Sequence, residues 1–427
     1  MTDQLVLTNA SLIDTDRGLR PNAAITISGQ RIEAITFDGR PNLPPGATVV
    51  DLKGASVMSG MFNCHYHATY KGIGANPGGF TPIGMEAPPA LQALRAANHV
   101  ALALDCGFTG LVSAGGPHAV DVSLKLAIED GLIRGPRIMA GSRDVSTTAH
   151  LQDRAVPWYW DIRENPGFNR CDGADAFRRG VREEVRRGAE IIKIFLTCGH
   201  PDVPEITAES DLTREELAAA IEAAHLCGVK VRAHAARRSA VLAAVELGID
   251  VIDHGDGLDE ACIALMAAKG TFLAPSMLYP YRVGQSATGA FGDSVKRGTE
   301  HMLKVLPLAN AAGVKIVLGD DFGAVPLKHG EYGDELDFYV NVAGIPPLDV
   351  LRWATRHGPE LMGLGQDLGR LEPGALADLI VIDGDPVADI GVLKRKDSIL
   401  AVLKGGRFEK NRLPVAERAF GEARSVA

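Results

Sequence analysis

Residues 58–67 read MSGMFNCHYH, and this stretch decides the fold. It is a short apolar run that ends in two histidines, His65 and His67, which lie two positions apart. On a strand such residues point to the same side, so both imidazoles would face one way. Imidazole nitrogens are ligands for zinc and similar ions. The stretch therefore predicts a buried strand with a metal-binding end, although two hydrogen-bonded histidines beside a turn would give the same pattern.

Further polar residues stand at the ends of apolar runs downstream. They are Lys193 in EIIKIFL, His234 in VKVRAH, His254 in DVIDH and Asp321 in VLGDD. In a βα barrel the carboxyl ends of the strands meet on one face, which carries the active site. We therefore expect these side chains to converge with the histidine pair, while Asp320 points away if its strand is regular. Each also has a plainer explanation: a lysine whose head reaches solvent or an acid, structural histidines, and an aspartate that caps a helix.

The middle of the chain alternates strand-like and helix-like segments. The strand candidates are MSGMFNCHYH, FTGLVSAGG, PRIMAGS, EIIKIFLT, VKVRAH, DVIDHG, TFLAPS and VKIVLGDD. Between them, apolar residues recur at spacings of three and four, and most of these helical segments end at glycine. The pattern predicts an α/β fold with a (β/α)8 TIM barrel over residues 57–369. A doubly wound open sheet is the alternative.

The two ends of the chain differ from the middle. Residues 1–56 contain LVLTNASLID, AAITISGQRIEAI and ATVVDLKG, which alternate apolar and polar residues around turns. Residues 370–427 return to this style in ADLIVIDGD and SILAVLKGGRFEK. We expect both ends to pack together as one small β-sandwich domain.

Composition excludes several classes of function. The 427 residues are 46% hydrophobic and carry a net charge of −9, so binding to nucleic acid or to an anionic membrane is not expected. No apolar run is long enough to span a bilayer, and the first residues do not resemble a signal peptide. The six cysteines are dispersed without a C-x-x-C pair, which favours free thiols in a reducing compartment. These features predict a cytoplasmic protein.

Taken together and in this order, the motifs resemble the amidohydrolase superfamily of metal-dependent hydrolases. MSGMFNCHYH is similar to the family's P-G-x-I-D-x-H-x-H opening, and GALADLIVIDGDPVADI is similar to its C-terminal return strand. The lysine, the two later histidines and the final aspartate fall in the family's order. Ser59, Asn63 and Asp320 replace the usual proline, aspartate and threonine, and none of these replaces a ligand.

The resemblance is to members with two divalent ions and a modified lysine. The implied ligands are His65, His67 and Asp321 for the first ion, His234 and His254 for the second, and Lys193 as a bridging N6-carboxylysine. Zinc is the first choice of metal, with manganese, cobalt and iron left open. A hydroxide between the ions would attack the substrate, and Asp321 would pass its proton to the leaving group.

The branch that this chain most resembles contains prolidase-like and Xaa-Arg dipeptidases and amidases acting on aryl-acyl amino acids. The implied reaction is hydrolysis of the amide bond of a small molecule, an N-acyl amino acid or a dipeptide. The expected substrate-binding residues are His150, Arg237, Arg238, Tyr70, His200 and Tyr279. Alternatives are the same site acting on a carbamate, arylurea, lactone or cyclic amide, and a non-enzymatic interaction protein. Similar sequences suggest a homo-oligomer.

Overall fold

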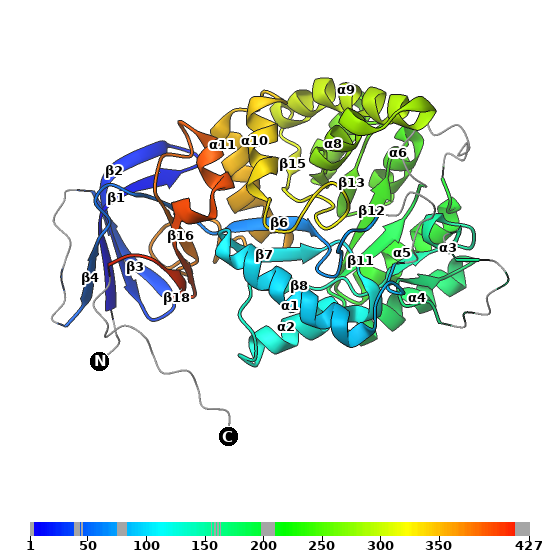
Figure 1. Ribbon diagram of the computed structural model, residues 1–427. Helices are drawn as coiled ribbons and strands as arrows, with labels where there is room; N and C mark the ends of the chain where they lie inside the picture. The colour runs from blue at the N-terminus through cyan, green and yellow to red at the C-terminus, as the bar shows by residue number, and fades with distance from the viewer. Residues whose placement is uncertain are drawn as a thin grey trace.

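Both ends of the chain contribute strands to one mixed sheet, drawn at the left of Figure 1. Its order is β18-β17-β16-β5-β1-β2-β3, and β4 pairs with β1. The strands are β1 Gln4–Asp14, β2 Gly18–Ser28, β3 Arg31–Thr36, β4 Thr48–Asp51, β5 Ser56–Ser59, β16 Leu379–Ile382, β17 Ile399–Lys404 and β18 Arg407–Asn411. β5 lies parallel to β1 and antiparallel to β16, so it joins the two ends of the chain. One residue later β6 begins, which carries the histidine pair.

The structure is a computed structural model, and it describes residues 4–37, 43, 46–74, 83–154, 156–157, 159, 162, 164–197 and 210–414. His200, one of the residues expected to bind substrate, lies outside these ranges. Among the residues that are described, none of the helices combines the length and the apolar character needed to cross a lipid bilayer.

The middle of the chain forms two parallel sheets, so the fold class is α/β as the sequence predicts. One sheet has the order β6-β7-β8 and the other β10-β9-β11-β12-β13-β14-β15. These strands are β6 Met61–Tyr66, β7 Phe108–Ser113, β8 Arg137–Met139, β9 Asp144–Ser146, β10 Phe168–Arg170, β11 Ile191–Phe195, β12 Lys230–Ala235, β13 Val251–His254, β14 Phe272–Ala274 and β15 Lys315–Ile316. Backbone hydrogen bonds connect the two sheets in two places. Cys64 donates to Leu318 O (2.6 Å), and Glu190 donates to Ala140 O (2.8 Å).

Two expected strands are shorter than their sequences suggest. Within PRIMAGS, strand β8 ends at Met139, and strand pairing resumes in β9. VKIVLGDD forms only the two-residue β15, although Val317 and Leu318 continue hydrogen bonding to the neighbouring strands. Gly319 then has a φ of 140°, which takes the chain out of regular strand geometry.

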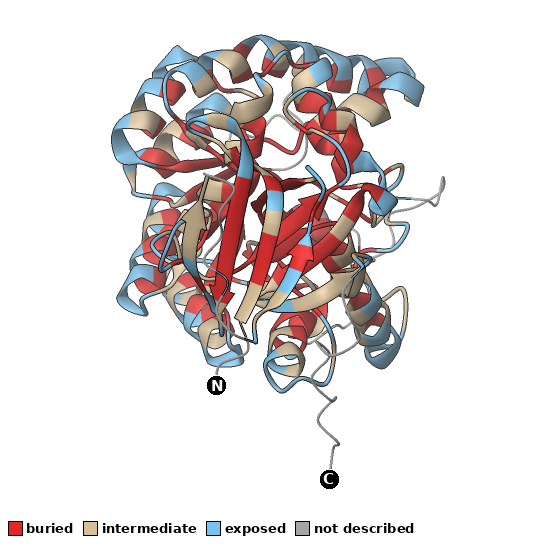
Figure 2. Cartoon of the chain, turned by 90° about the vertical axis from the view of Figure 1, so that its left-hand side faces the viewer, coloured by how far each residue is buried: buried red, intermediate tan, exposed pale blue. Residues whose placement is uncertain are grey.

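Helices lie between the parallel strands and cover them on the outside (Figure 1). They are α1 Pro89–Asp105, α2 Val120–Glu129, α3 Leu151–Arg154, α4 Ala174–Arg187, α5 Arg214–Leu226, α6 Arg238–Glu246, α7 Glu260–Lys269, α8 Leu278–Ser286, α9 Gly289–Ala311, α10 Gly333–Asn341, α11 Pro347–Arg352 and α12 Gly358–Leu361. Local sequence explains several boundaries. Thr213 and Glu216 form a capping box at the start of α5, and α4 ends at Gly188 with a φ of 111°. Figure 2 shows buried residues along much of the strands and exposed residues on the outer faces of the helices.

Candidate metal centre

The histidine pair on β6 is buried, and each ring has one nitrogen engaged by a hydrogen-bond acceptor. His67 Nδ1 lies 2.9 Å from Gly115 O, and His65 Nδ1 lies 3.2 Å from Asp253 Oδ1. Arg232 Nη2 also lies 3.3 Å from His65 Nδ1. A neutral imidazole carries one N–H, and we place it on Nδ1 in both rings, where these oxygen acceptors take it. Both Nε2 atoms therefore present lone pairs, and they face each other at 3.3 Å.

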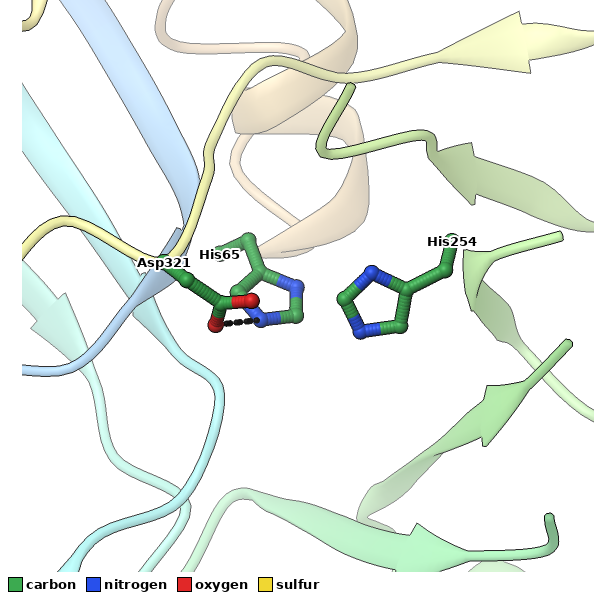
Figure 3. A group of neighbouring side chains, drawn as sticks. All are labelled: His65, His254 and Asp321. Carbon is green, nitrogen blue, oxygen red and sulfur yellow. Dashed lines mark ion pairs between the residues drawn. The ribbon is translucent and has the colours of Figure 1, made fainter. Parts of the chain in front are cut away.

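Asp321 adds a third acceptor to the same point (Figure 3). Its Oδ1 lies 3.2 Å from His65 Nε2 and 3.3 Å from His67 Nε2. With the N–H of each ring on Nδ1, all three atoms present lone pairs, and a cation between them would hold them at this spacing. Ligand atoms arranged tetrahedrally at about 2.0–2.1 Å from a zinc ion would be about 3.3–3.4 Å apart. The donor set therefore fits a divalent ion of this size.

Gly319 allows Asp321 to approach the histidine pair. A Cβ atom at this position would lie 2.1 Å from His65 N, so only glycine lets the segment after β15 pass so close to β6. Asp320 points elsewhere, although the segment after Gly319 is not a regular strand. Its Oδ2 accepts hydrogen bonds from Leu278 N (2.8 Å) and Tyr279 N (3.2 Å).

The later histidines lie beside this group. The ring centroid of His254 is 5.1 Å from that of His65 and 4.4 Å from that of His234. One ligand atom from each of His65, His254 and Asp321 falls within 4.8 Å of the others (Figure 3). Burial lowers the pKa of His67 to about 4 and that of His254 to about 3, so both rings are neutral ligands at neutral pH.

His234 and Lys193 complete the cluster. His234 Nε2 is buried and finds no hydrogen-bond partner in the described part of the chain, which is costly unless a ligand satisfies it. Burial, and the charges of His254 and Lys193, lower the pKa of His234 well below its usual value. Lys193 is buried on β11, and its Nζ lies 2.7 Å from Asp253 Oδ2. The six residues expected from the sequence are thus brought together.

Two further residues lie in the cluster that the motifs did not point to: Arg232 and Asp253. Both are fully buried, and the guanidinium of Arg232 contacts both oxygens of Asp253 through Nε (3.0 Å) and Nη2. Burial alone would raise the pKa of the Asp253 carboxyl, but the charges of Arg232 and Lys193 hold it well below its usual range. Spacing could have identified Arg232, since it precedes His234 by two positions on the same strand and so shares its face.

Aromatic rings flank the candidate ligands on two sides. The phenol of Tyr70 stacks on His67, with centroids 4.0 Å apart and an angle of 3° between the planes. Phe195 stacks on His234 (4.9 Å, 15°), and the ring of His150 lies 4.5 Å from that of Phe195. Phe195 was not identified from the sequence, although it follows Lys193 by two positions.

The other residues that were expected to bind substrate differ in their position relative to the candidate ligands. Tyr279 packs on a small apolar cluster that contains Tyr70. Arg237 is the residue before the first turn of α6. The guanidinium of Arg238 binds Asp259, and more than half of this side chain is exposed. The structure therefore brings Tyr70, His150 and Tyr279 to the cluster and leaves Arg238 in a surface ion pair.

Comparisons with known proteins identify the family of this chain. The amidohydrolase family model matches residues 56–408. The chain belongs to the amidohydrolase family. An ochratoxinase from Aspergillus niger is 29% identical over 372 residues, covering 83% of this chain and 75% of that protein. An imidazolonepropionase from Cereibacter sphaeroides is 27% identical over 397 residues, covering 87% and 91%. The crystal structure of a prolidase complexed with N-methylphosphonate-L-proline has a TM-score of 0.83 and 29% identity, and covers 96% of this chain and 100% of that one.

Family membership defines the general chemistry. This amidohydrolase is a hydrolase of C–N bonds, and the family acts on small molecules. Its members are typically metal-dependent, and the His65, His254 and Asp321 group is a candidate metal site of the kind that such a member needs.

Proposed function

We propose that this amidohydrolase cleaves the amide bond of an N-acyl amino acid or a dipeptide with the help of two divalent ions. The observation that carries the proposal is the convergence of His65 Nε2, His67 Nε2 and Asp321 Oδ1 within 3.3 Å of one another, with both histidine protons held elsewhere. The complex of the similar prolidase with N-methylphosphonate-L-proline supports a dipeptide-like substrate.

The proposal includes the architecture that places this site. We assign residues 57–369 to a closed (β/α)8 barrel, and residues 1–56 and 370–427 to one small β-sandwich domain. Support for closure comes from the backbone hydrogen bonds Cys64–Leu318 and Glu190–Ala140, which connect the two parallel sheets in two places. Support for the second domain is the single sheet that both chain ends build.

The candidate ligands divide into two sets. His65, His67 and Asp321 would hold one ion, and His234 and His254 would hold the other, with Lys193 between them as N6-carboxylysine. The unpartnered Nε2 of His234 supports the second ion, and zinc suits this donor set best. When bound, such ions supply hydroxide at neutral pH and polarise a carbonyl group.

The residues of the chain have separate tasks in this proposal. The Asp321 carboxylate takes the proton of the attacking water and passes it to the nitrogen of the leaving amine. The rings of Tyr70, His150 and Tyr279 shape the pocket beside the ligands. Arg237, the residue before the first turn of α6, binds the substrate carboxylate.

A second candidate keeps the site and changes the substrate to a cyclic amide, with carbamates, arylureas and lactones as related possibilities. The similarity to an imidazolonepropionase over most of both chains favours this alternative. A non-catalytic interaction protein is no longer supported, since the chain is a hydrolase and its six candidate ligands lie together. The proposal also includes a homo-oligomer, which light scattering measures.

The deciding experiment is an assay of purified, zinc-loaded protein against matched substrates. A library of N-acyl amino acids and dipeptides is compared with neutral amides, cyclic amides and arylureas at equal concentration. Faster hydrolysis of the carboxylate-bearing compounds supports the first candidate. Equal or faster turnover of carboxylate-free compounds favours the second, and no hydrolysis of any amide contradicts both.

A further inference from the structure

The environment of Asp253 points to a positioning residue for the proposed metal site, an inference that rests on the proposed function. We propose that Arg232 is the permanent counter-charge of Asp253, which holds His65 with Nε2 turned toward the cation, and that Lys193 is thereby free for another role. Arg232 lies on β12, Asp253 on β13 and His65 on β6, so three strands meet through one buried ion pair.

The contacts of Arg232 use nearly the whole guanidinium. Nε and Nη2 donate to the two oxygens of Asp253, and Nη2 also lies 3.3 Å from His65 Nδ1. Nη1 donates to Cys64 O (2.8 Å) and to Ser113 O (3.0 Å). Cys64 is the residue before His65, so the group that holds Asp253 also holds the backbone of the histidine strand. A lysine at this position could not make this planar set of contacts, because its ammonium is a single point of charge.

Charge balance separates Arg232 from Lys193. A buried carboxylate needs a counter-charge, and Asp253 touches two: Arg232 and Lys193 (2.7 Å). One cation is enough to neutralise one carboxylate. An arginine stays protonated in proteins, so Arg232 supplies that charge under all conditions. Lys193 is therefore the dispensable partner of Asp253.

The consequence for His65 is a fixed ring orientation. Asp253 Oδ1 accepts the Nδ1–H of His65 at 3.2 Å, which leaves Nε2 as the acceptor that faces Asp321 and His67. Without Arg232, the carboxylate would turn toward Lys193, its remaining counter-charge, and the His65 ring would lose its anchor. Loss of such a supporting contact typically weakens metal binding by about 10–100-fold.

The test measures cation affinity and not activity. Metal-free protein is titrated with Co2+ against a competing chelator, and the visible absorption of the bound Co2+ reports on its ligands. Arg232→Met should lower the Co2+ affinity of the proposed cation site that binds more tightly by about 10–100-fold. Arg232→Lys, which keeps the charge without the planar fork, should fall between this variant and the wild type. Lys193→Met should keep one cation at wild-type affinity, since Arg232 still neutralises Asp253.

Arg143 provides the matched control. It is a buried arginine that binds Glu184 through Nη2 (2.7 Å) and Nε (3.2 Å). Its guanidinium also contacts Glu164 and Asn165, and none of these three partners is a candidate ligand. Arg143→Met should lower thermal stability and leave Co2+ affinity and the absorption spectrum unchanged. An effect on Co2+ binding as large as that of Arg232→Met would show that loss of any buried arginine disturbs the site, and would overturn the inference.

The remaining outcomes are distinct. If the wild type binds no Co2+, the proposed function fails. If the wild type binds Co2+ and Arg232→Met binds it equally well, only the role of Arg232 is overturned. If Arg232→Met does not fold, Arg232→Lys decides, because wild-type affinity in that variant contradicts the need for the guanidinium. A Lys193→Met protein that loses both cations would also contradict the inference, because Arg232 alone would then not keep Asp253 and His65 in place.

Discussion

Asp253 and His254 are adjacent in the chain, yet both side chains reach His65. Asp253 Oδ1 lies 3.2 Å from its Nδ1, and the ring of His254 lies 5.1 Å from its ring. Neighbours on a regular strand face opposite sides, and this pair does not because His254 has a φ of 68°. A non-glycine residue in this region costs about 1–3 kcal/mol and is found most often at functional sites. The strain at β13 is thus what places both groups around one histidine.

The charge of Asp253 should be essential for the stability of the metal-free protein. Asp253→Asn leaves Arg232 and Lys193 buried without their carboxylate, and breaking a buried ion pair costs about 3–5 kcal/mol. Urea unfolding of metal-free protein measures this loss. Asp378→Asn is the control, because it breaks a partly buried pair between Asp378, next to β16, and Arg137 on β8, and should leave cation binding intact. Wild-type stability of Asp253→Asn would contradict the prediction.

Lys193→Ala tests the proposed bridge between two ions. We expect it to abolish most turnover and to reduce the bound metal from two ions to one, since the bridging carboxylate can no longer form. Steady-state kinetics and metal analysis of the same preparation measure both effects. Unchanged turnover in Lys193→Ala would remove the bridge from the mechanism.

Arg237 and Arg238 form a natural matched pair. Arg237→Ala should raise KM for carboxylate-bearing substrates and leave neutral substrates unaffected, because it removes one contact to the substrate carboxylate. Arg238→Ala should change neither, since the Arg238 guanidinium already binds Asp259 on the surface. Equal KM effects of Arg237→Ala on charged and neutral substrates would count against the carboxylate contact.

Much of this arrangement follows from two simple rules of sequence. Strand alternation and the placement of polar residues at strand ends predict that His65 and His67 point together with Lys193 and His234. The remainder depends on backbone geometry that alternation does not contain. The turn at His254 brings Asp253 to the same centre. A buried arginine such as Arg232 is not expected from its residue type, because burial of a charge is costly without a partner, and the sequence does not show that Asp253 is this partner.

His329 should make stability depend on pH. Its burial lowers its pKa from 6.5 to about 3, so the folded protein keeps this ring neutral where the unfolded chain protonates it. The unfolded state binds more protons between pH 6.5 and 3, so stability is complete above pH 6.5 and falls as the pH drops toward 3. His329→Gln should remove a slope of up to about 1.4 kcal/mol per pH unit.

Urea unfolding at pH 7 and pH 5 measures that slope in both proteins. The contacts suit a neutral ring, since Nε2 faces Tyr70 O (3.1 Å) and Nδ1 faces the Tyr332 hydroxyl (2.9 Å). His225→Gln, at a largely exposed histidine of α5, serves as the control. An identical pH dependence in His329→Gln and the wild type would show that His329 does not contribute to it.

Gly319 should be needed for cation binding although it offers no ligand. Gly319→Ala would place a Cβ 2.1 Å from His65 N and 2.8 Å from His65 Cα, so the segment bearing Asp321 must move away from β6. Gly374 is a suitable comparison, because its φ of 92° is also unfavourable for alanine but nothing lies within 4 Å of the added Cβ. Both variants should lose about 1 kcal/mol or more of folding stability through backbone strain, and Gly319→Ala should lose more through the clash.

Co2+ titration separates the effect on stability from the effect on the site. Co2+ affinity should fall in Gly319→Ala and stay at the wild-type level in Gly374→Ala. Equal affinities in the two variants would mean that the distance between Asp321 and the histidine pair does not determine cation binding.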